Sequence, residues 1–271
     1  MNESLEHDYA PVCDLYERHL GPTLFEPYAV DLARRISIDC REGSVLEMAC
    51  GTGILTQQLR THLEPTVSLT ATDINPGMLD YAQRNLKDLR GIDWQQADIV
   101  SLPFPDASFN VAVCQFGLMF VPDRDRAFRE MRRVLVKGGL LAFNVWDRME
   151  TNPYGIIVHE TVAGFFLDNP PQFFTAPYSF ADVDILRRLL LTTGFDQVEI
   201  QVVPKQCSCG TAKSLAIGLI KGAPILAEIQ ARGGSSEAII EAVAAALART
   251  GGDTPYRSTM QAIVTTARSK E

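Results

Sequence analysis

The sequence predicts an α/β protein with a mostly parallel sheet, and three features of the chain lead to this fold class. Residues 45–59 combine an apolar run, a turn with Gly51 and Gly53, and apolar residues at helical spacing, which is typical of a strand that leads into a helix. Residues 109–114 are almost wholly apolar, as a central parallel strand buried on both faces should be. Elsewhere short apolar runs alternate with helical patterns, which favours strand–helix–strand units.

The expected elements follow one another regularly along the chain. Residues 8–39 are mostly helical in pattern, with breaks at Gly21-Pro22 and at Pro27. After residues 45–59 the pattern predicts a strand at 67–72, a helix through 81–86, a strand ending at 94–97, the strand 109–114, a helix at 123–135, a strand at 140–146, a helix at 181–193, and strands at 197–203 and 260–267.

Composition sets limits on the class of protein. A chain of 271 residues with 46% apolar content can bury the core of one large domain. The net charge of -8 and the lack of a basic run argue against a nucleic-acid partner. No apolar run approaches the ~20 residues needed to cross a bilayer, and the polar first residues do not resemble a signal peptide, so we expect no membrane span and a cytoplasmic location.

The cysteines and the other potential ligands give no sign of a metal. The six cysteines form no C-x-x-C pair, and without a leader sequence we expect reduced thiols rather than disulfides. His, Asp and Glu do not cluster at the spacing of metal ligands. We therefore expect no metal site. The oligomeric state is not predicted.

The residues around the glycine turn distinguish two kinds of ligand. A dinucleotide places a pyrophosphate at the helix N-terminus and favours a third glycine, but Thr56 stands there, and Glu47 lies four residues before Gly51. A carboxylate at this place would repel a pyrophosphate and attract an ammonium group, which favours S-adenosylmethionine. Asp73, about 20 residues past the glycines, ends the next strand and can accept hydrogen bonds from ribose hydroxyls. A G-x-G turn alone also fits a ligand-free connection or an NAD-dependent oxidoreductase.

Four stretches, in the same order along the chain, carry a resemblance to a known family. They are residues 47–53, 72–79, 96–104 and 130–139, which read EMACGTG, TDINPGML, QADIVSLPF and EMRRVLVKGG. The chain resembles the class I S-adenosylmethionine-dependent methyltransferases, and within them the small-molecule group that includes the ubiquinone and menaquinone C-methyltransferases. The resemblance covers roughly residues 40–146.

The resemblance implies a Rossmann-like sheet of seven strands, mostly parallel with an antiparallel last strand, and a helical cover. It implies S-adenosyl-L-methionine as cofactor and a small-molecule methyl acceptor. Together with the position of the strand ends, it gives the expected cofactor-binding residues, which are Tyr16, Phe25, Glu47, Ala49, Gly51, Gly53, Asp73, Ile74, Met78, Asp98, Ile99, Gln115 and Phe116.

Several of these assignments have a plainer alternative. Met78 could fill the core between helix and sheet, as methionines often do. Asp98 could cap a turn instead of accepting from the adenine amino group. Tyr16 and Phe25 could pack the N-terminal helices on the sheet, since aromatic residues at helical spacing usually do. The family resemblance instead makes residues 1–39 an N-terminal helical lid, with a cofactor-binding core at 40–146.

The substrate side is expected after the fifth strand. Residues 147–180 are too rich in aromatic residues to be a solvated linker, so we expect them to cover the active-site edge. The expected pocket residues are Phe120, Trp146, Tyr154 and Phe165. His159 is a weak candidate for a general base, because its pKa of ~6.5 suits that role, but a lone histidine on an apolar helix is more often packed or exposed.

The whole chain, residues 1–271, is expected to form a single domain. Residues 204–256 are expected to be a helical insertion between the last two strands, with glycine pairs at 233–234 and 251–252 as hinges. In-line transfer from a sulfonium needs mainly a well-placed acceptor, and acceptors that ionise easily need no base. A methyltransferase-like protein that binds the cofactor without chemistry remains the alternative.

Overall fold

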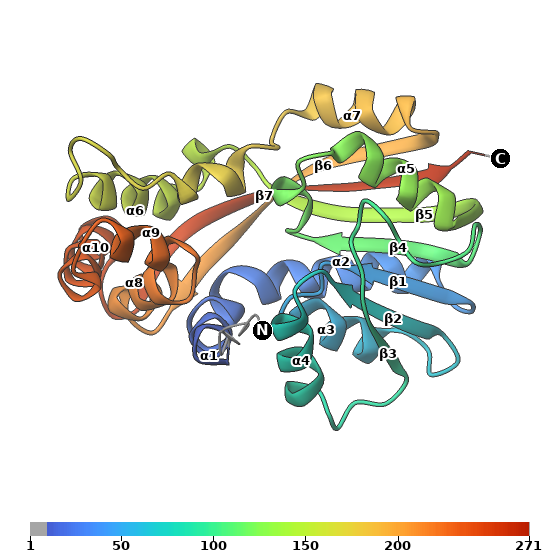
Figure 1. The fold of residues 1–271 in the computed structure, drawn as a ribbon, viewed down its shortest axis with the longest axis horizontal. Coiled ribbons are helices and arrows are strands. Elements are labelled where there is room, and N and C mark those ends of the chain that lie inside the picture. The colour runs from blue at the N-terminus through green and yellow to red at the C-terminus, as the bar shows by residue number, and fades with distance from the viewer. Residues whose placement is uncertain (1–9, 271) are drawn as a thin grey trace, which may run out of the picture.

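A seven-stranded sheet forms the centre of the computed structural model, which describes residues 10–270 (Figure 1). The strands lie in the order β3-β2-β1-β4-β5-β7-β6. Their bounds are β1 Ser44–Met48, β2 Ser68–Asp73, β3 Ile92–Gln96, β4 Phe109–Gln115, β5 Leu135–Trp146, β6 Phe195–Cys209 and β7 Tyr256–Ser269. The first five strands are parallel, and β7 is antiparallel to both of its neighbours. The predicted fold class is confirmed.

Ten α-helices surround the sheet within the described residues. They are α1 Ala10–His19, α2 Glu26–Asp39, α3 Ile54–His62, α4 Pro76–Asn85, α5 Arg124–Val134, α6 Pro153–Ala163, α7 Val183–Thr192, α8 Ala212–Lys221, α9 Ile225–Ala231 and α10 Ser236–Gly251. Short polar side chains begin several of them: Asn75 accepts from the backbone N–H groups of Gly77 and Met78, and Asp123 accepts from that of Arg126. Such caps satisfy N–H groups that have no partner inside the helix.

The two faces of the sheet are covered by different helices because successive strand residues point to opposite sides. On one face Val45 of β1 and Val111 of β4 join α2 and α3 in one apolar cluster. On the other face Leu46 of β1 and Ala112 of β4 belong to a second cluster, together with α5 and α7. Strand β4 is thus apolar on both sides, as its sequence predicts.

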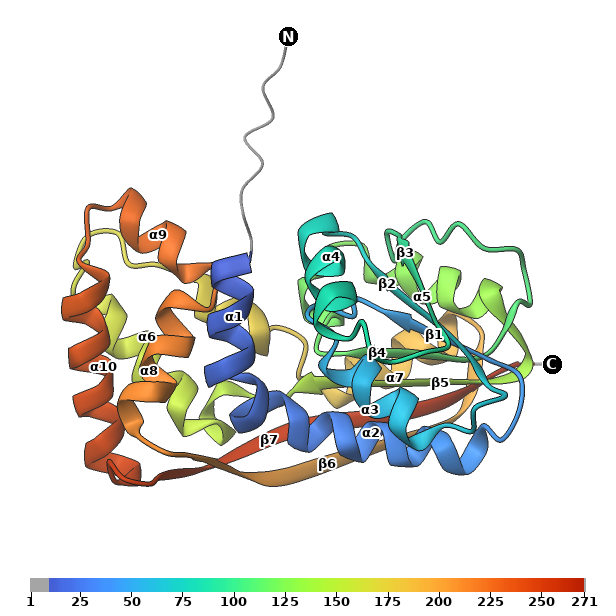
Figure 2. The same ribbon diagram turned by 90° about the horizontal axis from the view of Figure 1, so that it is seen from below.

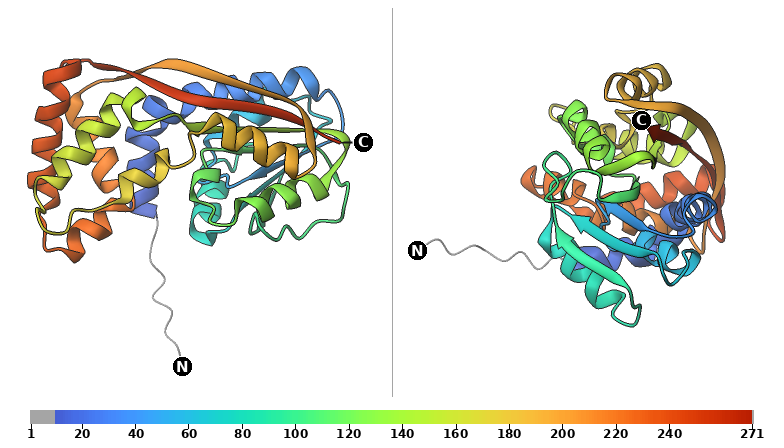
Figure 3. Two further views of the ribbon diagram at one scale, coloured as in Figure 1. Left: turned by 90° about the horizontal axis from the view of Figure 1, so that it is seen from above. Right: turned by 90° about the vertical axis from the view of Figure 1, so that its right-hand side faces the viewer.

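A helical lobe lies beyond one end of the sheet. It contains α1, α6, α8, α9 and α10, and strands β6 and β7 run out of the sheet into it (Figures 1 and 2). Viewed from the opposite side, β6 and β7 cross the whole length of the molecule (Figure 3). Apolar residues of this lobe, such as Leu215, Ile239 and Val243, belong to the same cluster as the α5 face of the sheet. The lobe therefore shares a core with the sheet.

Some predicted boundaries are wrong. Strands β6 and β7 extend to Cys209 and from Tyr256, so the helical insertion starts at Ala212 and not at residue 204. These strands continue to pair with each other beyond the end of β5. Polar residues can stand on the exposed face of this extension, so the strands are longer than the apolar pattern suggested. Pro27 does not break a helix, because it occupies the first turn of α2, where a proline needs no N–H partner. A π-helix η1, Gly21–Phe25, joins α1 to α2.

Candidate active site at the strand ends

The turn after β1 holds the backbone in left-handed conformations. Ala49 has a φ of 52°, Gly51 of 56° and Gly53 of 93°. A Cβ added to Gly51 would meet nothing within 4 Å, so the space in front of this residue is open. A Cβ on Gly53 would lie 2.8 Å from Leu86 Cδ1, so that glycine serves the packing of α4. A glycine is thus required at the two positions for different reasons: Gly53 makes room for a neighbouring side chain, whereas Gly51 faces open space.

Asp73, at the end of β2, is joined to this turn. Its Oδ2 accepts a hydrogen bond of 2.8 Å from the backbone N–H of Gly51, and its Oδ1 accepts one of 2.8 Å from that of Asn75. A carboxylate oxygen can accept more than one hydrogen bond. Asp73 therefore fixes the turn and keeps acceptor capacity at the edge of the sheet.

Glu47 lies in β1 and is buried. Burial, together with the charge of Asp73, raises the pKa of its carboxyl group to about 8, although the nearby Thr56 hydroxyl favours the ionised form. Thr56 is close to Glu47, but the two side chains do not reach full hydrogen-bond geometry. The acid is thus largely neutral at pH 7 and would ionise beside a cation.

The residues predicted for adenine lie on the β2–β3 side of the turn. Ile74 is 60% exposed. Met78 is half-buried, and its Sδ accepts a weak hydrogen bond from the thiol of Cys13 over 3.6 Å, so it contacts α1. Asp98 Oδ1 accepts from the backbone N–H of Val100 at 3.0 Å, which caps a turn, and its other oxygen is left for a second partner. Ile99 is half-buried beside it.

The end of β4 is tied to the N-terminal segment and to β5. The Nε2 of Gln115 donates to the carbonyl of Phe25 over 3.3 Å, while its Oε1 is buried without a partner. Phe116 has a φ of 51°, and its N–H donates to Asn144 Oδ1 on β5 over 3.0 Å. A left-handed conformation at a phenylalanine is uncommon, and such strain gathers at functional sites.

Aromatic side chains from separate parts of the chain meet above these strand ends. Phe116 and Trp146 stack with ring centroids 4.1 Å apart, and Phe25 contacts both at 5.6 Å and 6.0 Å. Tyr16 stacks on Phe25 at 4.9 Å. We call this set the aromatic cluster, and its members are Tyr16, Phe25, Tyr28, Phe116, Trp146 and Tyr154. Sequence placed these residues in different segments, and the fold brings them together.

The predicted pocket residues do not share one environment. Phe120 is 50% exposed and stacks loosely on Phe173 at 6.4 Å. Trp146 and Tyr154 are buried in the aromatic cluster, where their rings contact each other. Phe165 is 47% exposed after the end of α6. An acceptor can therefore reach Phe120 directly, whereas Trp146 and Tyr154 lie behind other side chains.

Two further side chains have buried polar atoms without a hydrogen-bond partner, the base candidate His159 and Asn144. His159 on α6 has a buried Nδ1 without a hydrogen-bond partner. Asn144 is fully buried in β5 and was not predicted, although a lone amide inside an otherwise apolar strand could have drawn notice. It accepts from Phe116 N–H and so sets the backbone at the end of β4.

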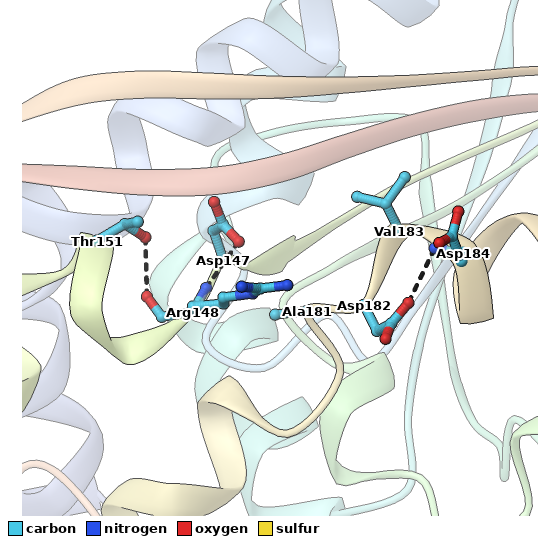
Figure 4. Close-up of a pocket in the computed structure, with 7 residues that line it drawn as sticks. All are labelled: Asp147, Arg148, Thr151, Ala181, Asp182, Val183 and Asp184. Atoms are coloured by element: carbon cyan, nitrogen blue, oxygen red, sulfur yellow. Dashed lines mark hydrogen bonds between the residues drawn. The ribbon is translucent and has the colours of Figure 1, made fainter.

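Two surface pockets lie away from the glycine turn. One, of ≈ 360 Å³, is lined by residues from the end of β5 and the start of α7 (Figure 4). Its residues are Asp147, Arg148, Thr151, Ala181, Asp182, Val183 and Asp184. The other, of ≈ 340 Å³, lies between α5 and α7. Neither is lined by a residue expected to bind the cofactor or expected in the acceptor pocket, although Asp147, Arg148 and Thr151 belong to the expected substrate cover.

The strand order, the glycine turn and the acid that ends β2 define a nucleotide-type site at the carboxyl ends of parallel strands. Residues 46–143 match the family model described as a methyltransferase domain. The chain belongs to the class I S-adenosylmethionine-dependent methyltransferases. This confirms the resemblance, and it favours the methyltransferase over the oxidoreductase alternative.

Two relatives with similar sequences are methyltransferases by name. The ubiquinone/menaquinone biosynthesis C-methyltransferase UbiE of Escherichia coli O1:K1 is 30% identical over 185 residues, which are 62% of this chain and 74% of the relative. UbiE of Pasteurella multocida is 29% identical over 188 residues, 61% of this chain and 68% of the relative. The enzyme therefore uses S-adenosyl-L-methionine to methylate a small-molecule acceptor.

Solved structures share the fold. Phosphoethanolamine N-methyltransferase 2 of Haemonchus contortus, determined in complex with S-adenosyl-L-methionine, has a TM-score of 0.62 at 14% identity and covers 99% of this chain and 59% of that chain. The YcgJ protein of Bacillus subtilis has a TM-score of 0.58 at 19% identity, over 90% of this chain and 99% of that chain. At such identities the likeness concerns the fold alone.

The described residues show neither a membrane-spanning helix nor a cluster of metal ligands. Within residues 10–270 no single helix is long and apolar enough to span a bilayer, although α8 and α9, bent by 72°, pass that test as a pair by length and composition. The same residues hold no group of three or more His, Cys, Asp or Glu side chains able to bind a metal ion. The cytoplasmic location and the lack of a nucleic-acid partner stay predictions.

Proposed function

We propose that S-adenosylmethionine lies across the carboxyl ends of β1, β2 and β4, and that the open space at Gly51 is the observation that carries this placement. A Cβ there would meet nothing within 4 Å, so a ligand can approach the backbone closely. Glu47 stands behind the turn and gains a favourable partner when a cationic ammonium is near. Asp73 stands beside it with acceptor capacity for ribose hydroxyls.

The other predicted cofactor residues fit this placement by position. Ile74 and Met78 would contact the adenine, with Asp98 accepting from its amino group and the Ile99 N–H donating to the ring. Ala49, Gly53 and Gln115 would surround the methionine part, where the buried Gln115 Oε1 lacks a partner. Tyr16, Phe25 and Phe116 would cover it. The bound cofactor supplies an electrophilic methyl group on a sulfonium, and the protein positions the acceptor.

We further propose a planar, largely apolar acceptor. The strand ends on the acceptor side carry aromatic rings, with Phe116 stacked on Trp146 at 4.1 Å and Phe120 exposed beside Phe173. Flat rings favour a flat partner through stacking. The relatives that are named ubiquinone/menaquinone biosynthesis C-methyltransferases indicate the same kind of acceptor. Residues 147–180 would form the cover, with Phe165 at its outer end.

Catalysis in this proposal comes mainly from positioning. Holding the acceptor about 3 Å from the methyl group, in line with the C–S bond, replaces a bimolecular encounter with an oriented one. A phenolic acceptor can lose its proton to a nearby base, and His159, with its unpartnered Nδ1, is the candidate. His159→Gln therefore tests the base, and an unchanged rate would leave positioning as the main contribution.

Labelled S-adenosylmethionine tests the acceptor class. We expect methylation of hydroquinones and phenols that carry an apolar substituent, and little of phosphoethanolamine, which would need a cluster of basic groups around its phosphate. Gly51→Val serves as the inactive control, because its defect lies on the cofactor side. Preferential methylation of phosphoethanolamine, or of a nucleic acid, would contradict the proposed acceptor while leaving the methyltransferase family intact.

A further inference from the structure

One face of α1 looks toward the cofactor-binding half of the molecule. Cys13, Asp14 and Glu17 lie on it, at the three- and four-residue spacing that places side chains on one side of a helix. The thiol of Cys13 contacts Met78 Sδ at 3.6 Å, and Asp14 Oδ1 accepts from the hydroxyl of Tyr81 at 2.9 Å. Both partners belong to α4. The end of this face reaches the glycine turn.

Glu17 is the residue of this face that meets the turn. The hydroxyl of Thr52, which directly follows Gly51, favours the ionised form of the Glu17 carboxyl. The two side chains nevertheless lack full hydrogen-bond geometry, and Glu17 Oε1 and Thr52 Oγ1 are both buried. Thr52 itself is buried in the turn. A carboxylate oxygen is therefore held out of water next to the proposed position of the methionine part.

The surroundings of Glu17 are acidic. Within residues 10–270 it takes part in no ion pair, as the ion pairs among them join other side chains. Burial, and then the charge of Glu26, raise the pKa of its carboxyl group. Glu47, near the end of β1, and Asp73, bonded to Gly51, add acidic groups at the same turn. A buried carboxylate without a cation is costly, so this arrangement fits a cation that arrives with the ligand.

We propose that Glu17 is a cofactor-binding residue of the N-terminal helix, whose carboxylate, in addition to that of Glu47, pairs with the α-ammonium group of S-adenosylmethionine. The inference rests on the proposed position of the cofactor at Gly51. It makes α1 more than an apolar cover, because the helix contributes a charge to the ligand. A ligand with the ammonium group then holds α1 in place, and a ligand without it does not.

Calorimetry with two probes tests the pairing. S-adenosylhomocysteine carries the ammonium group, whereas 5′-methylthioadenosine keeps the adenine, the ribose and the sulfur but lacks the amino-acid part. We expect Glu17→Gln to weaken S-adenosylhomocysteine by about tenfold or more, the usual size for loss of a charge-assisted hydrogen bond, and to leave 5′-methylthioadenosine unchanged. Glutamine keeps the shape of the side chain, so the helix should remain folded.

Asp14→Asn is the matched control. Asp14 lies on the same face of α1 and bonds to Tyr81 on α4, so its change loosens the helix without removing a charge from the turn. We expect Asp14→Asn to weaken the binding of both probes equally, and by less than Glu17→Gln weakens S-adenosylhomocysteine. Equal weakening of both probes by Glu17→Gln, or no weakening of either, would overturn the pairing. A wrong cofactor position would give another result, because Gly51→Val would then bind both probes with wild-type affinity.

Discussion

Asp73 shows how one side chain serves both the fold and the proposed site. Its carboxylate bonds to the N–H of Gly51 and to that of Asn75, which caps α4. The end of β2, the glycine turn and the start of α4 are thus fixed by one acid. The sequence predicted an acid for ribose here, but the bond to the turn depends on the distance between two strand ends and is visible only in the fold.

Gly51→Val should abolish binding of S-adenosylhomocysteine. Its branched side chain would fill the open space in front of the turn, which the cofactor is proposed to occupy. Gly138→Val is the matched control, since Gly138 also has a positive φ, at 71°, and open space around its Cβ, but lies in β5 after α5. Calorimetry should find no binding by the first variant and normal binding by the second. Normal binding by both would refute the glycine-turn assignment.

Glu47 should make the stability of the ligand-free protein fall as the pH rises. Its carboxyl has a pKa near 4.5 when free and about 8 in the fold, so between these values the folded state holds the extra proton. The contribution is complete below pH 4.5 and is lost through pH 8, with a slope of up to about 1.4 kcal/mol per pH unit. Urea unfolding of wild type and Glu47→Gln measures it.

The difference between the two proteins isolates this residue, because other titrating groups contribute equally to both. We expect the stability of Glu47→Gln relative to wild type to rise steadily from pH 5 to pH 8. A difference that does not change with pH would mean that Glu47 is ionised throughout, and thus that a cation or a water-filled space lies beside it.

At the scale of elements, features that depend on local sequence patterns were predicted better than features that depend on long-range contacts. The strand–turn–helix units around Gly51 and Asn75 follow from periodicity and capping, and they match the structure closely. The length of β6 did not follow from the sequence. Its outer half pairs with a part of β7 that has no β5 partner, and it is exposed on alternate residues. A strand without an apolar face leaves little period-two signal.

The aromatic cluster shows the same limit. Tyr16 and Phe25 were expected either to cover the cofactor or to pack on the sheet, and their spacing could not decide. Tyr16 stacks on Phe25, and the contacts of Phe25 with Phe116 and Trp146 join residues about a hundred positions apart. The fold supplies these neighbours, and it also shows that Asp98 caps a turn, as the plainer alternative had it, without using its second oxygen.

Gly218 of α8 and Gly222, which directly follows that helix, let α1 approach closely. A Cβ on Gly218 would lie 2.6 Å from Leu20 Cδ2 and 2.7 Å from His19 Cβ, and one on Gly222 would lie 3.0 Å from the backbone nitrogen of Tyr16. His19 Nδ1 also meets Ser214 Oγ at 2.8 Å. The N-terminal helix is therefore docked on the helical insertion, which the sequence had treated as a separate segment.

Gly218→Ala should loosen this docking. The new methyl group pushes the α1–α8 contact apart, which we expect to cost about 1 to 3 kcal/mol, less the gain in helix propensity of alanine. Gly210→Ala, just before α8 and with nothing within 4 Å of its Cβ, is the control and should be nearly neutral. Urea unfolding compares them. Equal stability of the two variants would mean that α1 shifts freely on α8.

At the scale of the whole molecule, α1 belongs to the helical lobe and also contacts α4 beside the sheet. Its close packing on α8 ties it to the helical lobe, while its contacts with α4 include the hydrogen bond of Asp14 with Tyr81 and the contact of Cys13 with Met78. The long strands β6 and β7 join the same lobes on the other side (Figure 2). An arrangement with a strong connection at one side and small contacts at the other suits a cover that opens.

The last prediction concerns this cover. Entry of a bulky cofactor and acceptor needs an opening, and in-line transfer needs water excluded once both are bound. The first part of the predicted lid, up to Tyr9, lies outside the described residues. Hydrogen exchange with S-adenosylhomocysteine should show added protection over residues 10–28 and over α6 with the segment to Tyr178. The strands β4 and β5, buried in the core, should change little and serve as the internal control.

Comparison of the protection of residues 10–28 with that of α8 shows whether α1 moves alone or together with the helical lobe. Because α1 is docked on α8, we expect α8 to gain protection together with α1, so that the helical lobe closes as a unit. Protection of residues 10–28 without α8 would mean that α1 moves alone on its glycine contact. Equal exchange with and without the ligand would indicate a rigid, preformed site, and Tyr16 and Phe25 would then be core residues that pack the helices on the sheet.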